Sequence, residues 1–139
     1  MKWMVILGIA CALTAGCACK NENVAAPTNT LIGTKWLLIA WSVSSLHPSA
    51  HTITADFGES DISGRSAVNG YGGRYTAIDK GMFSVGELTA TEMAGSPDAM
   101  RAESLYFDLL KQARKYEVSG TTLTLRNEGN QELLIFQAR

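Results

Sequence analysis

Short runs in which apolar and polar residues alternate follow one another from residue 35 to residue 137 of this 139-residue chain. Residues 52–57 read TITADF, so every second side chain is apolar, as in a strand with one buried face. Turn-forming residues separate the runs, for example at 79–81, 119–120 and 127–130. The predicted strands are 35–41, 52–57, 62–67, 74–78, 82–88, 116–118, 121–126 and 132–137.

One segment has helical periodicity instead. Ser96 can cap a helix, Pro97 suits its first position, and Asp98 places a negative charge in its first turn. The pattern predicts one amphipathic helix near residues 97–114, which plugs or flanks the sheet and buries its apolar stripe against the concave side. The predicted fold is therefore α+β, mainly antiparallel β: a meander or cracked barrel of about eight short strands with this helix.

Glu103 interrupts the apolar stripe of the predicted helix. The stripe otherwise contains Ala99, Ala102, Tyr106, Phe107, Leu109, Leu110 and Ala113. An unpaired carboxylate there would cost several kcal/mol, so Glu103 needs partners. It is either a marker of a functional site or a structural acceptor of hydrogen bonds from backbone N–H groups or an arginine. Because no histidine, serine or second carboxylate is placed in the sequence to cooperate with it, the structural role is favoured.

The N-terminal residues are typical of an exported protein. Lys2 precedes an uncharged apolar run at 3–13 and the small residues 14–16, which together form a signal peptide over residues 1–16. Cys17 follows, and residues 13–17 resemble the bacterial lipobox, in which the cysteine is acylated. Cys11 and Cys19 are weaker candidates for lipidation, and ordinary cleavage with release of a soluble protein is the alternative.

A polar segment at 17–30 is predicted to be a flexible, lipidated tether, followed by a folded domain over 31–139. Ala18 after the cysteine resembles the outer-membrane sorting pattern, which predicts a lipid-anchored protein of the bacterial cell envelope that faces the periplasm. The formal net charge of −1 provides no electrostatic basis for binding nucleic acid. Expected partners are the membrane and an envelope protein, and the oligomeric state is left open.

Candidate reactive groups are few. His47 and His51 flank Pro48, with no carboxylate or cysteine nearby to complete a metal site. The glycine-rich stretch 64–75 leads into a strand, whereas phosphate-binding loops lead into a helix. No serine or threonine has a nucleophile motif. The sequence therefore predicts no catalytic residue, no metal and no cofactor.

Several motifs in this order resemble the META/HslJ family of small bacterial envelope proteins. The similarity runs from about Leu31 to Gln137. Its residues are Trp36 in the opening strand, Gly64, Asn69, Gly73 and Tyr75 in the glycine-rich stretch, Thr91, Met93 and Ala94 in a TEMAG motif, Glu103 in the helix, and the closing hairpin at 123–136. The resemblance implies an antiparallel fold with one helix and links to heat-shock response, novobiocin resistance or virulence, but it supplies no catalytic residue.

Two departures from the family pattern occur together. Val68 and Gly95 stand where the family often has cysteines. This double replacement leads to the hypothesis that Val68 and Gly95 are close in space, since no disulfide spans Cα atoms well beyond about 7 Å.

Three functional hypotheses follow. The first is a non-catalytic, lipid-anchored envelope protein that supports stress tolerance or novobiocin-type antibiotic resistance by binding a partner or apolar ligand. The second is a pilot-like lipoprotein chaperone that accepts an amphipathic partner segment in a barrel groove. The third is an enzyme, or an inhibitor of an envelope hydrolase that uses a protruding loop at 47–51.

Overall fold

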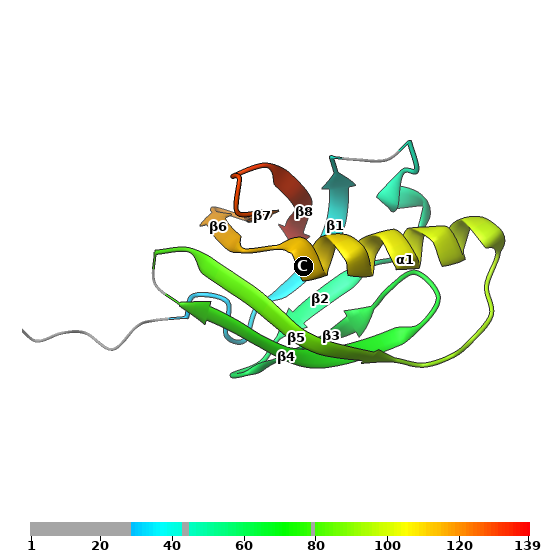
Figure 1. Ribbon diagram of the computed structural model, residues 1–139, viewed down its shortest axis with the longest axis horizontal. Helices are drawn as coiled ribbons and strands as arrows, with labels where there is room; N and C mark the ends of the chain where they lie inside the picture. The colour runs from blue at the N-terminus through cyan, green and yellow to red at the C-terminus, as the bar shows by residue number, and fades with distance from the viewer. Residues whose placement is uncertain (1–28, 43–44, 79) are drawn as a thin grey trace, which may run out of the picture.

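The computed structural model describes residues 29–42, 45–78 and 80–139. This part of the chain forms eight strands, one α-helix and one short 3₁₀ helix (Figure 1). In chain order the elements are β1 (Lys35–Trp41), η1 (Pro48–Ala50), β2 (Thr54–Phe57), β3 (Asp61–Arg65), β4 (Gly70–Ile78), β5 (Met82–Ala90), α1 (Pro97–Gln112), β6 (Lys115–Ser119), β7 (Thr122–Arg126) and β8 (Glu132–Ala138). The predicted mainly antiparallel fold with one helix is confirmed.

The strands form a closed barrel in simple meander order. Each strand pairs antiparallel with the next, and β8 returns to pair with β1, for example Leu38 with Phe136. The seam between β5 and β6 is the weakest, because its register contains one pair, Met82 with Lys115. Helix α1 connects these two strands and contacts both β5 and β8, so it covers the place where β5 diverges from β6 (Figure 1).

The inward side chains of the strands and the apolar stripe of α1 form one core. Tyr106 and Leu110 of α1 are fully buried, and the Tyr106 ring packs edge-on against Phe136 of β8 at 6.5 Å between centroids. Burying a large apolar side chain contributes about 1.5–3 kcal/mol, so this stripe fixes the helix in place. Ala99 and Phe107, also predicted in the stripe, are only partly buried at its margin.

Some boundaries differ from the predicted ones. Strand β4 begins at Gly70, four residues before the predicted start at 74, and includes the two consecutive glycines Gly72 and Gly73. The short helix η1 was not predicted, and it packs on β1 with Pro48 buried. Asn29, two residues before the expected start of the domain at Leu31, contacts the barrel, since its side-chain amide donates to the Tyr75 hydroxyl at 2.9 Å.

Candidate functional site

Glu103 on α1 holds the connection between β3 and β4. Its Oε2 accepts hydrogen bonds from the backbone N–H of Asn69 at 2.9 Å and, at 3.4 Å, from that of Val68. The hydroxyl of Ser66 lies 2.7 Å from the same oxygen and 3.0 Å from the carbonyl of Asn69, so it can donate to either. Glu103 is 8% exposed. The carboxylate is therefore a buried acceptor for the hairpin tip at residues 66–69.

Asn69 extends this network to the segment between β5 and α1. Its side-chain amide donates to Glu103 Oε1 at 2.8 Å and to the carbonyl of Met93 at 3.3 Å. Its Oδ1 accepts from the Thr91 hydroxyl at 2.8 Å and from the Met93 backbone N–H at 2.7 Å. Asn69 thus uses both the nitrogen and the oxygen of its side-chain amide. The Met93 side chain takes no part in these bonds and is 55% exposed. Ala94, the next residue of the motif, is exposed, and its side chain carries no hydrogen-bonding group.

Opposing influences act on the pKa of Glu103. Burial raises the pKa, but the hydrogen bonds from Ser66, Asn69 and Val68 outweigh burial and lower it below the ordinary value of 4.5. A general acid would need the opposite shift. In the described part of the chain, no group of three histidine, cysteine, aspartate or glutamate side chains is placed to hold a metal ion. The geometry of Glu103 is that of the structural acceptor favoured by the sequence.

Two glycines of the motif allow close backbone contacts. A Cβ at Gly64 would lie 2.2 Å from the carbonyl oxygen of Thr54, and a Cβ at Gly73 would lie 2.5 Å from the carbonyl oxygen of Glu87. Such distances exclude any side chain without a shift of the backbone. Gly73 also adjoins the register shift in the pairing of β4 with β5. Both glycines therefore serve the geometry of the barrel.

The aromatic motif residues are likewise engaged in the fold. The indole N–H of Trp36 donates to the Thr34 hydroxyl at 2.7 Å, and the hydroxyl of Tyr75 donates to the Gly58 carbonyl at 2.7 Å. Deeper in the core, the Tyr71 and Tyr106 hydroxyls lie 2.6 Å apart. Burial raises the pKa of both phenols above the ordinary value, so they remain protonated at neutral pH.

Val68 and Gly95 are in contact, as hypothesised. A Cβ built on Gly95 would lie 3.5 Å from the Cβ of Val68 and 2.6 Å from its Cγ2. A Cβ separation of this size matches that of a disulfide, which is about 3.5–4.5 Å. Because Gly95 has no side chain, the Val68 side chain alone occupies the space that two linked cysteines would need.

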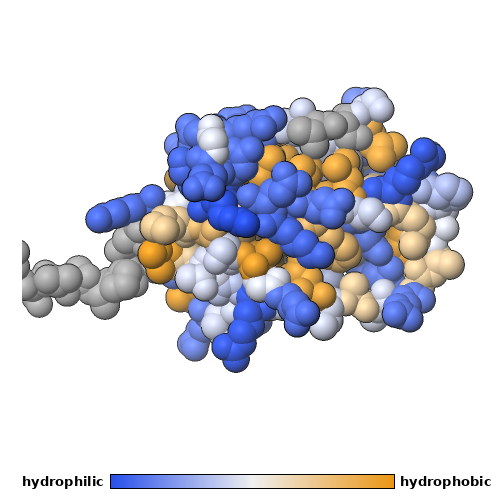
Figure 2. All heavy atoms as spheres, viewed as in Figure 1, coloured by the Kyte–Doolittle hydropathy of each residue, from blue (hydrophilic) through white to orange (hydrophobic). Residues whose placement is uncertain are grey.

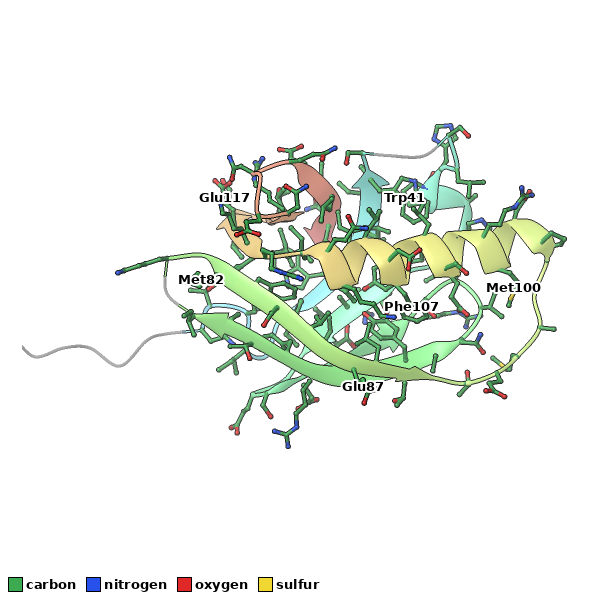
Figure 3. The ribbon with its side chains drawn as sticks, viewed as in Figure 1. Trp41, Met82, Glu87, Met100, Phe107 and Glu117 are labelled. Atoms are coloured by element: carbon green, nitrogen blue, oxygen red, sulfur yellow. The ribbon has the colours of Figure 1, made fainter. Side chains whose placement is uncertain are left out.

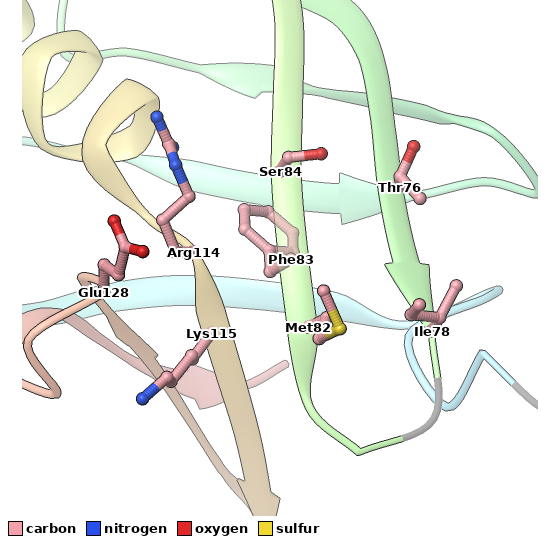
Figure 4. A pocket seen from close by; sticks show the side chains of 8 residues that line it. All are labelled: Thr76, Ile78, Met82, Phe83, Ser84, Arg114, Lys115 and Glu128. Atoms are coloured by element: carbon pink, nitrogen blue, oxygen red, sulfur yellow. The ribbon is translucent and has the colours of Figure 1, made fainter.

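A mainly apolar hollow lies at the seam between β5 and β6. We call it the hairpin groove; its volume is about 550 Å³. Figure 4 shows the β4–β5 hairpin on one side and the junction of α1 with β6 on the other. Its lining residues are Thr76, Ile78, Met82, Phe83, Ser84, Arg114, Lys115 and Glu128.

The hairpin groove combines an apolar floor with two basic groups, Arg114 and Lys115, and one acid, Glu128, at its edge. Phe83 is 3% exposed and forms part of the floor, whereas Ile78 and Met82 are 39% and 57% exposed. Arg114 and Lys115 come from the end of the helix and the start of β6 (Figure 4). The sequence did not reveal this site, because its sides are separated by more than 30 residues and meet only through the pairing of Met82 with Lys115.

Other sequence candidates fall outside this site. His47 and His51 flank η1, which packs on β1 through the buried Pro48, while Ser49 and Ala50 are exposed. The predicted signal peptide, the predicted lipidation site Cys17 and the predicted tether up to residue 28 lie outside the described residues. Among the residues that are described, no helix is long and apolar enough to cross a membrane.

The chain shares its fold with small bacterial proteins of known structure. A protein from Burkholderia xenovorans, solved by NMR, is 26% identical with a TM-score of 0.63, over 78% of this chain and 83% of that one. A DUF4847 family protein from Bacteroides vulgatus, solved by crystallography, is 12% identical with a TM-score of 0.59, over 78% and 94% of the two chains, and this likeness concerns the fold alone. No curated protein sequence matches the chain. The META domain family model matches residues 29–139, which is the whole described domain. The chain belongs to the META domain family.

Proposed function

We propose that this META domain is held at the cell envelope by a lipid on Cys17 and acts by binding, without catalysis, in support of envelope stress tolerance or novobiocin-type resistance. The observation that carries this proposal is the hairpin groove, which places an apolar floor beside Arg114 and Lys115. This combination suits an amphipathic ligand, such as an acyl chain or an apolar partner segment that carries negative charge.

The anchor is supported by the sequence around Cys17. Two or more acyl chains, each buried methylene contributing about 0.8 kcal/mol, make attachment effectively permanent. The domain needs no disulfide for this environment, since its buried side-chain polar atoms in the described part all have partners and its core is continuous. Such a domain can be stable without a disulfide in an oxidising compartment. This matters because Cys19 would have no partner within the mature chain.

Binding is favoured over catalysis by the state of the polar groups. The Glu103 carboxylate, the residue most suggestive of chemistry in the sequence, is directed into the fold and engaged by Ser66, Val68 and Asn69. The hairpin groove, in contrast, is open to solvent at Ile78 and Met82. Exposed apolar side chains beside a concave floor are a feature of binding surfaces.

The second candidate function is a pilot-like chaperone, and the structure limits its form. Tyr106 and Leu110 are fully buried in the barrel, in the space that an interior groove for a partner would need. A partner segment would therefore have to dock in the hairpin groove on the outside. An inhibitor that acts through residues 47–51 is less well supported, because η1 packs on β1.

A deletion strain complemented with matched variants tests the proposal. The native chain should restore growth in the presence of heat, detergent and novobiocin, whereas Cys17→Ser and the double variant Ile78→Asp/Met82→Asp should not. The matched control is Met93→Asp/Met100→Asp, because Met93 and Met100 are 55% and 38% exposed against 57% and 39% for Met82 and Ile78. Unchanged sensitivity of the deletion strain, or equal rescue by all four chains, would contradict the proposal.

A further inference from the structure

Exposed apolar side chains gather at the end of the barrel where the described chain begins. Within the described residues, half of the exposed large apolar side chains lie there: Ile32, Ile78, Met82 and Val118, which are 48%, 39%, 57% and 38% exposed. Ile78 and Met82 face each other across the β4–β5 hairpin. Val118 and Thr30 line one shared hollow, and the Ile32 N–H bonds to the Asn29 carbonyl. Together with Lys80 of the hairpin turn and Lys115 at the start of β6, these four residues are called the tether-side surface.

The barrel fixes the position at which the tether leaves this surface. The Asn29 amide donates to Tyr75 of β4 at 2.9 Å, and the Thr30 hydroxyl lies 3.3 Å from the hydroxyl of Tyr116 of β6. Residues 29 and 30 are thus held between two strands at the barrel end. In Figure 2 hydrophobic side chains lie at the end of the domain where the described chain begins, and Figure 3 places Met82 on that same side and Met100 on the far side.

The charges at this end are of both signs: Lys80 and Lys115 lie at the β4–β5 hairpin and the start of β6, and the exposed acids Glu59 and Asp61 lie in and beside the β2–β3 turn, which contacts Tyr75. Lys80 and Lys115 are exposed, and in the described part of the chain no salt bridge engages either of them. The nearby acid Glu117 faces Arg126 at 3.6 Å, and Arg126 also pairs with Glu132 at 2.8 Å. Exposed lysines beside exposed apolar side chains match the interface of a bilayer that contains anionic lipids.

The length of the tether keeps this surface near the membrane. Eleven residues, 18–28, lie between Cys17 and Asn29. A flexible chain of that length has an end-to-end distance of about 20 Å. Once Cys17 is in the bilayer, the barrel end at residue 29 is the part of the domain closest to the lipid, and its effective concentration at the surface is high.

We infer that the tether-side surface docks on the anionic phospholipid bilayer itself, with Ile32, Ile78, Met82 and Val118 in the interface and Lys80 and Lys115 against lipid phosphates. This inference rests on the proposed lipid anchor and names the ligand of the hairpin groove, whose rim shares Ile78, Met82 and Lys115 with this face. The opposite end of the barrel, with Met93 and Met100, then faces away from the membrane.

The test uses the full chain, processed in cells and reconstituted into vesicles of phosphatidylethanolamine and phosphatidylglycerol. In a Cys19→Ser background, an environment-sensitive fluorophore is attached to Met82→Cys or to the matched control Met93→Cys, since the two methionines are 57% and 55% exposed. The emission at position 82 should shift to the blue in these vesicles, and the emission at position 93 should not. Lys80→Glu/Lys115→Glu should remove the shift at position 82.

Flotation of the same samples distinguishes a failure of the lipid anchor from a failure of bilayer docking. If the chain floats with the vesicles but position 82 shows no shift, or positions 82 and 93 shift equally, bilayer docking is wrong while the anchor stands. If the chain does not float, and behaves like Cys17→Ser, the anchor is wrong and the docking inference falls with it. An equal shift in vesicles of phosphatidylcholine alone would contradict the role given to the lysines.

Discussion

Replacement of Glu103 tests whether this carboxylate is the structural acceptor of the β3–β4 connection. In Glu103→Ala the hydroxyl of Ser66 keeps the Asn69 carbonyl as an alternative acceptor at 3.0 Å. The backbone N–H and the side-chain amide of Asn69, which donate to Glu103 at 2.9 and 2.8 Å, lose their acceptor. Each buried donor left unsatisfied costs about 1–3 kcal/mol, so the unfolding free energy should fall by about 2–5 kcal/mol.

Glu103→Gln is the more discriminating variant because it keeps the shape of the side chain. Its amide oxygen can replace Oε2, which accepts from Ser66, Val68 and Asn69. Its amide nitrogen then faces the side-chain nitrogen of Asn69, and two donors meet. Rotating the Asn69 amide does not help, since Oδ1 already accepts from Thr91 and Met93. One mismatched buried pair should cost about 1–3 kcal/mol.

The pH dependence adds a second, independent signature. The folded-state pKa of Glu103 is lowered from 4.5, so its contribution to stability is complete above that value and is lost as the pH falls through the folded-state pKa. Glutamine has no such titration. The difference in stability between the native chain and Glu103→Gln should therefore be largest near neutral pH and shrink in acid.

Urea denaturation of both proteins, followed by tryptophan fluorescence at pH 7 and at several values below 4.5, measures this difference. Ser104→Ala, at an exposed neighbouring position on α1, is the matched control for a change in the helix. Equal stability of Glu103→Gln and the native chain at pH 7 would refute the acceptor role. So would a difference that persists unchanged in acid.

Two further predictions concern the packing of the same region. Val68→Cys/Gly95→Cys should form a disulfide under oxidising conditions and raise the melting temperature, detected by its loss on reduction; a free thiol pair in the folded protein would contradict the 3.5 Å Cβ separation. Gly64→Ala should destabilise the domain by about 3 kcal/mol or more, because its Cβ meets the Thr54 carbonyl. Gly70→Ala, whose Cβ meets nothing closer than 3.9 Å, should cost far less in the same thermal melts, and equal losses would show that the close approach does not matter.

The elements that the sequence predicted well are those with local signals. Strand β1 begins and ends as predicted, because its burial alternates, and α1 begins at Pro97 as predicted, because Ser96 caps it and accepts from the Ala99 N–H at 3.3 Å. The start of β4 was missed because glycines carry no alternation of side chains. Those residues are in a strand since β3 and β5 pair with them on both sides.

The candidate site depended on contacts that no local pattern contains. The side chain of Asn69 bonds Met93, 24 residues away, and Glu103, 34 residues away, and no local pattern indicates either partner. The hairpin groove likewise arises only when the barrel brings Met82 beside Lys115. Such sites depend on the closure of the barrel. The sequence predicted the class of fold, but it did not predict the register in which the strands pair.

The most direct test of the proposed function is mass spectrometry of the N-terminal peptide of the mature protein from cell envelopes. A peptide that begins with Cys17 and carries a diacylglyceryl group is the predicted result. A mature chain that begins at another residue, or that retains Cys17 as a free thiol, would contradict the lipid anchor and with it the place given to this domain at the membrane.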